Sequence, residues 1–114
     1  MDKVVPKIAA IGVPALIFMV ALSLTGLTGA AAITAALAML GPFGMIGGLL
    51  TLGVSGVIAH ALTEYGLEKL FSAVVKELYK KGETKTTIRN KIEKAPISKS
   101  LKLKVLDELN KVRG

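Results

Sequence analysis

The fold of this chain is decided by residues 8–63, which read IAAIGVPALIFMVALSLTGLTGAAAITAALAMLGPFGMIGGLLTLGVSGVIAHALT. These 56 consecutive residues contain no Asp, Glu, Lys or Arg, and His60 is their only ionisable side chain. A soluble domain of 114 residues covers its core with polar side chains, so its helices carry polar residues in every turn. A membrane-spanning helix instead needs about 20 apolar residues without charges at its centre. The pattern predicts a membrane-embedded half, with a fully buried helical hairpin inside a soluble oligomer as the alternative.

The charged residues are concentrated in the rest of the chain. Residues 64–114 carry 13 Lys and Arg against 7 Asp and Glu, and residues 1–7 add two lysines and one aspartate. We therefore divide the chain into a transmembrane helical region, residues 1–64, and a basic cytosolic helical region, residues 65–114. Basic residues that flank membrane segments favour the cytoplasmic side. This predicts a protein of the inner (cytoplasmic) membrane with its C-terminal tail in the cytoplasm.

Glycine and proline divide the apolar half into three helical segments. Residues 8–24 form the first segment, which Pro14 should kink, and residues 25–29 break it. Residues 30–40 cover only about half of a ~30 Å hydrocarbon core. After a turn at residues 41–44, the third segment runs over residues 45–62 and is expected to continue unbroken to residue 81. The prediction is an all-α fold: a membrane helical hairpin of two spans with a short re-entrant or third apolar helix, then a small cytosolic helical tail. Three short crossings remain the alternative.

The tail contains two further predicted helices. Thr84 or Thr86 can cap a helix that ends at Lys94, and Ser98 can cap the last helix. Their apolar stripes, together with that of the preceding helix, could form a three-helix cluster. Because so small a cluster is marginal by itself, we expect it to dock on another surface or to oligomerise.

Catalytic residue sets are missing from the sequence. The chain has no cysteine, which excludes disulfides, thiol catalysis and thiolate metal sites. No zinc, phosphate-loop or dinucleotide motif is present. We therefore expect no enzymatic activity, no cofactor and no metal.

Small residues recur in the apolar half at intervals of four. In lipid, this spacing lets helix backbones approach closely and associate. The predicted helix-packing residues are Ala30, Thr34, Ala38, Gly44 and Gly48. A row of hydroxyls on the third segment could line a narrow pore once several copies assemble. The candidate pore-lining residues are Thr51, Ser55, Ala59, His60 and Thr63. Alternatively, the small residues only pack the hairpin, and each hydroxyl bonds the carbonyl four residues earlier.

The basic tail has a simple explanation and a more specific one. Lysines next to a span hold it on the cytoplasmic side and contact anionic membrane lipid. In a homo-oligomer the same residues would form a ring that attracts an acidic protein, a nucleotide or an oligonucleotide. The candidate lipid- or ligand-binding residues are Lys80, Lys81, Lys85, Arg89, Lys91, Lys99, Lys102 and Lys104.

Together these features favour a homo-oligomeric membrane pore or channel whose basic tail controls assembly or gating. The apolar hairpin with a lysine-rich end resembles, in outline, phage holins, toxin-type peptides and membrane effectors of bacterial defence systems. That resemblance implies permeabilisation, depolarisation or growth arrest. Two alternatives stay open: a non-conducting membrane anchor or adaptor that docks a soluble partner through its tail, and a secreted cationic bacteriocin.

Overall fold

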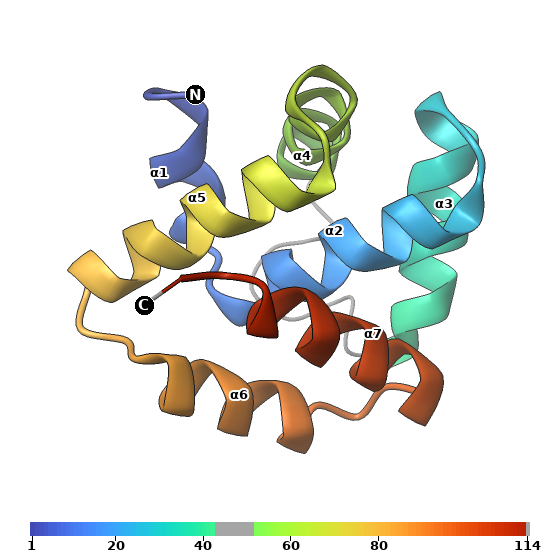
Figure 1. The fold of residues 1–114 in the computed structure, drawn as a ribbon. Helices are drawn as coiled ribbons and strands as arrows, with labels where there is room; N and C mark the ends of the chain where they lie inside the picture. The colour runs from blue at the N-terminus through green and yellow to red at the C-terminus, as the bar shows by residue number, and fades with distance from the viewer. Residues whose placement is uncertain (43–51, 114) are drawn as a thin grey trace.

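The computed structural model describes residues 1–42 and 52–113, and these form an all-α fold (Figure 1). No strand occurs within these residues, which confirms the predicted fold class. The helices in chain order are α1 (Val4–Ala9), α2 (Val13–Thr25), α3 (Gly29–Leu40), α4 (Leu52–Tyr65), α5 (Leu67–Lys80), α6 (Lys85–Lys94) and α7 (Lys99–Asn110). The molecule measures 34 × 31 × 22 Å along its principal axes.

Helix α2 runs through the middle of the molecule and contacts every other helix that the structure describes (Figure 1). The four consecutive side chains of residues 16–19 are all 0% exposed. Successive residues of an α-helix point about 100° apart, so four buried in a row mean that α2 is enclosed on all sides. Each large apolar side chain buried in this way contributes about 1.5–3 kcal/mol. Helix α2 is thus the centre of the hydrophobic core.

The first apolar segment is two helices, because it divides at Gly12. This glycine has φ 90° and ψ −152°, a backbone conformation that side chains disfavour, and α1 and α2 lie on either side of it. Pro14 falls in the first turn of α2, where its missing N–H has no helical partner to lose. The prediction of one kinked helix over residues 8–24 is therefore wrong.

The predicted unbroken helix up to residue 81 is also wrong, because it breaks at Gly66. Helix α4 ends at Tyr65 and α5 begins at Leu67, and Gly66 between them has φ 84°. The break turns the strongly amphipathic α5 back over the core, with Leu70, Phe71 and Val74 buried. A single glycine therefore separates α4, which carries Glu64 but no Lys or Arg, from the first basic helix.

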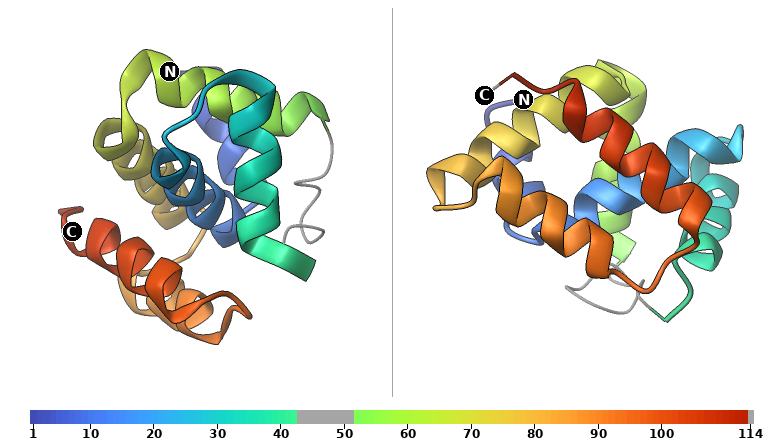
Figure 2. Two further views of the ribbon diagram at one scale, coloured as in Figure 1. Left: turned by 90° about the vertical axis from the view of Figure 1, so that its right-hand side faces the viewer. Right: turned by 60° about the horizontal axis from the view of Figure 1, so that its bottom comes forward.

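The tail helices begin where their sequence signals predict. Thr84 caps α6 in a reciprocal capping box with Thr87, and the Ser98 hydroxyl accepts a hydrogen bond from the Leu101 amide at the start of α7. The two helices pack on each other and on α2, which confirms the expectation that the tail helices dock on another surface. The right-hand view of Figure 2 shows them as a layer in front of α2.

Within the described residues, no single helix combines the length and the apolar character needed to cross a bilayer. Helices α2 and α3 meet that requirement only when taken together, and they are joined through a bend of 119°.

Candidate functional site

The α2–α3 pair has no polar group that depends on another part of the protein for its hydrogen bonds, except in its connecting turn. The Ser23 and Thr25 hydroxyls donate to the carbonyls of Val20 and Leu22 in their own helix, each at 2.8 Å. In α3, the Thr34 hydroxyl donates to the Ala30 carbonyl at 3.0 Å. No residue of either helix is charged. The hydroxyls of both helices are therefore satisfied within their own helix, as an apolar medium requires.

The outer face of α3 and the α2–α3 turn are exposed yet carry no charge. Leu24 and Leu27 are 44% and 52% exposed, and Met39 is 39% exposed. The predicted packing residues Ala30, Thr34 and Ala38 are exposed on this same helix. We call the exposed residues of 23–42 the uncharged surface. Exposed apolar side chains with no charge among them are a feature of interaction sites.

The predicted row of hydroxyls on α4 does not share one environment. Ser55 is buried at 1% exposure, Ala59 is half-buried, and Thr63 is exposed. The Thr63 hydroxyl donates to the Ala59 carbonyl at 3.1 Å, which is the local bonding that competes with a role in a pore. Thr51, like the predicted packing residues Gly44 and Gly48, lies outside the described residues.

His60 lies on the exposed side of α4. Its side chain is 82% exposed, and its Nε2 atom is 3.8 Å from Oε1 of Glu64, one turn later. Such an exposed pair contributes little stability. The position leaves the imidazole open to solvent in this fold.

Most of the basic candidates in the tail have partners within the tail. Lys85 Nζ donates to the Val112 carbonyl at 2.6 Å, and Arg89 Nη2 donates to Asn110 Oδ1 at 3.1 Å. Lys102 Nζ donates to the Glu93 carbonyl at 2.7 Å. Lys80 pairs with Glu77, and Lys91 pairs with Glu83. In the part of the chain that the structure describes, the candidates without a hydrogen bond or ion pair are Lys81, Lys99 and Lys104.

Glu83 organises the connection between α5 and α6. Its carboxylate accepts hydrogen bonds from the Lys91 ammonium and the Thr87 hydroxyl, and these two bonds lower its pKa below the ordinary value. The bonds tie Glu83, which precedes the cap residue Thr84, to the first two turns of α6.

A basic cavity of about 290 Å³ lies between α5 and the end of the chain. Its cations come from α5 and from residues after α7, and its two carboxylates are those of Glu68 and Glu108. The four cationic lining residues are Lys69, Lys76, Lys111 and Arg113. None of them is among the sequence candidates, because only the tertiary packing of α5 against α7 brings them together. Their local signal is no more than basic residues on an amphipathic helix, for Lys69 and Lys76, and at the end of the chain, for Lys111 and Arg113.

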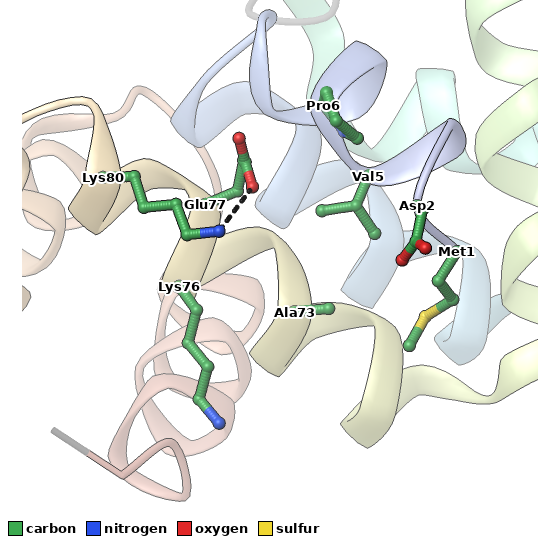
Figure 3. Close-up of a pocket in the computed structure, with 8 residues that line it drawn as sticks. All are labelled: Met1, Asp2, Val5, Pro6, Ala73, Lys76, Glu77 and Lys80. Atoms are coloured by element: carbon green, nitrogen blue, oxygen red, sulfur yellow. Dashed lines mark ion pairs between the residues drawn. The ribbon is translucent and has the colours of Figure 1, made fainter.

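A second cavity, of about 450 Å³, lies between the N-terminal residues and α5 (Figure 3). Asp2 and Val5 line one wall, and Glu77 lies across from them, joined to Lys80 by an ion pair of 3.8 Å. Lys76 is also in the lining, and the cationic and acidic side chains are equal in number. The cavity therefore lacks the excess of basic side chains found in the cavity between α5 and the end of the chain.

In residues 1–42 and 52–113, no three His, Asp or Glu side chains cluster in a way that could hold a metal ion. No protein-family model, curated protein or solved structure matches the chain significantly. The functional argument therefore depends on the uncharged surface, the buried α2 and the basic helices around it.

Proposed function

We propose that this protein acts on a bacterial inner membrane, where copies of it insert the α2–α3 pair and assemble into a permeabilising pore. The observation that carries the proposal is the uncharged surface. A soluble helical domain places polar residues on the outer face of each helix, whereas α3 presents alanines, Met39 and a single threonine. Hydrocarbon is the solvent that such a face tolerates best.

Helix length determines how this pair would enter a bilayer. Helix α2 has 13 residues and α3 has 12, so each is about 18–20 Å long at 1.5 Å per residue. Neither reaches across a ~30 Å hydrocarbon core alone. The pair would enter either as a re-entrant hairpin or, with the 119° bend opened, as one broken span.

Several copies are needed to enclose a path, and α3 offers the contact surface. Ala30, Thr34 and Ala38 follow one another at intervals of four and are exposed, so another copy can approach them closely. Rotational symmetry would then repeat one contact around a ring. In this arrangement the hydroxyls of α4 are the candidates to face the path, and the basic helices stay on the cytoplasmic side.

The test compares Leu27→Asp with Leu103→Asp. The two leucines are similarly exposed, 52% and 57%, and only Leu27 belongs to the uncharged surface. Both changes lower the net charge of the protein equally, so a difference between the variants reports the position of the new charge. An aspartate taken into the bilayer costs about 2.5–3.5 kcal/mol, or roughly a hundredfold in insertion.

The readouts are dye release from anionic vesicles and conductance in planar bilayers. We expect wild type and Leu103→Asp to release dye and give discrete currents, and Leu27→Asp to release about a hundredfold less. Equal release by the two variants would show that the α2–α3 turn does not enter the bilayer. Protein that inserts but never releases dye would contradict the pore.

A membrane anchor or adaptor is the second candidate, and the basic cavity between α5 and α7 favours it. Four cations against two carboxylates suit an acidic protein segment or a phosphate-bearing ligand. This function predicts insertion without conductance, together with partner binding that Lys69→Glu and Arg113→Glu weaken.

A further inference from the structure

We infer that α5, α6 and α7 form an exchangeable cover: the apolar faces that enclose α2 in this fold also bind an anionic bilayer, so α2 and the bilayer compete for them. This inference rests on the proposed membrane activity and gives it a control step. The compact fold is the state in which insertion is blocked, and an anionic lipid surface is the partner that releases it.

The cover is defined by its contacts with α2. All three helices pack against α2, with α5 on one side and α6 and α7 on the other (Figure 1). Each presents a stripe of apolar side chains to the core. The most deeply buried of these, at 0–3% exposure, are Leu70, Phe71, Val74, Val75, Leu78, Ile88, Ile92, Leu101, Val105 and Leu109.

The opposite faces of the same helices are basic. Residues 67–113 carry 13 Lys and Arg against 6 Asp and Glu. Amphipathic helices with a basic face lie in the interface of an anionic bilayer, with the apolar stripe toward the acyl chains. Lys81, Lys99 and Lys104, which have no partner among the described residues, are already available to lipid headgroups.

Helix α2 loses little by exchanging this cover for lipid. Its buried side chains are all apolar, and its two hydroxyls bond carbonyls of α2 itself. Acyl chains are as apolar as the leucines and valines they would replace. The exchange therefore breaks no polar contact of α2, while the apolar stripes of the cover gain contacts with acyl chains and its basic faces stay in reach of the headgroups.

The cover has the connections expected of a unit that moves together. Three long-range hydrogen bonds join α6 to α7 and the residues after it: those from Lys85, Arg89 and Lys102. A single residue, Gly66 with φ 84°, separates the cover from α4. Release of the cover from α2 then needs rotation at few backbone positions, and α6 and α7 stay together.

Engineered cysteine pairs test the exchange, since the chain has no cysteine of its own. Ile11 and Lys94 line one cavity of about 400 Å³ between the start of α2 and the end of α6. A short bismaleimide therefore links the two cysteines of the double variant Ile11→Cys, Lys94→Cys while the cover lies against α2. The linking yield reports how much of the protein has the cover in place. Arg89→Cys with Asn110→Cys is the control within the cover, and it also removes one positive charge.

Linking yield is measured in buffer, with phosphatidylcholine vesicles and with phosphatidylglycerol vesicles, after sedimentation shows what is bound. We expect the Ile11–Lys94 yield to fall at least about fivefold on phosphatidylglycerol alone. The Arg89–Asn110 yield should stay constant throughout. Dye release is recorded in parallel, so a lower yield without release would support the exchange while contradicting the pore.

Three results would overturn the inference. One is an unchanged Ile11–Lys94 yield in protein that sediments with phosphatidylglycerol vesicles. Another is protein that does not sediment with phosphatidylglycerol vesicles, because an anionic bilayer would then not be the partner of the cover. The third is an equal fall on phosphatidylcholine, which would remove the role of headgroup charge.

Discussion

Replacing Leu109 by alanine tests whether the basic tail and the apolar half form one folding unit. Leu109 is 0% exposed in the apolar stripe of α7, and α7 packs against α2, α5 and α6. Truncating a fully buried leucine removes apolar burial and leaves a cavity, which costs about 2–5 kcal/mol. For a domain whose total stability is about 5–15 kcal/mol, this is a large loss.

Leu103→Ala is the matched control, because Leu103 lies on the same helix and is 57% exposed. Surface substitutions usually change stability by less than about 0.5 kcal/mol. With a urea m-value of about 1–3 kcal/mol/M, the midpoint should fall by roughly 1–2 M for Leu109→Ala and scarcely move for Leu103→Ala. The assay is urea unfolding followed by far-ultraviolet circular dichroism.

The result that would refute this reasoning is equal midpoints for the two variants. Leu109 would then be as free of the core as Leu103, and α7 would not be packed on the apolar half. If the cover blocks insertion, Leu109→Ala should also release dye from anionic vesicles faster than wild type, because a weaker cover exposes α2 more often.

Two further predictions follow from local structure. The folded-state pKa of Glu83 lies below its unfolded value of 4.5. The ion pair between Glu83 and Lys91 therefore stabilises the fold above pH 4.5, and this stabilisation is lost as the pH falls through the folded-state pKa. Lys91→Met should therefore lower the urea midpoint at neutral pH and reduce its fall toward about pH 3; an unaltered pH profile would contradict this. Gly66→Ala should destabilise by about 1–2 kcal/mol, since φ is 84°, whereas Gly56→Ala, in mid-helix with open space around its Cβ, should stabilise by about 0.5–1 kcal/mol. Thermal midpoints check both signs, and shifts of the same sign would disprove the backbone argument.

Local signals in the sequence predicted much of the helix layout. The breaks at residues 25–29 and 81–84, and the caps Thr84 and Ser98, lie where turn residues and capping hydroxyls indicate. These features depend on backbone hydrogen bonds within a few residues, so a short window contains the information. The break at Gly66 was missed, because a glycine within a helical pattern is compatible with both a helix interior and a positive φ.

The candidate site was only partly predictable. The uncharged stretch was evident, and so were the small residues that α3 exposes at Ala30, Thr34 and Ala38. The basic cavity was not, because Lys69 and Arg113 lie 44 positions apart and meet only through the packing of α5 and α7. Ser55 and Thr63 share a helix face by spacing, yet the packing buries one and exposes the other.

The sequence by itself determined that the chain is helical, where most helices begin and end, and that residues 8–63 carry no Asp, Glu, Lys or Arg. Only the tertiary structure decided what surrounds α2. A helix that is apolar on every side has no polar face to orient it, so its sequence is equally compatible with acyl chains and with other helices. Here α2 is enclosed by α3 and by the amphipathic stripes of α5, α6 and α7, with α1 and α4 completing its surroundings. Those stripes meet α2 because Gly66 and the turns after α5 and α6 fold the basic half back over it.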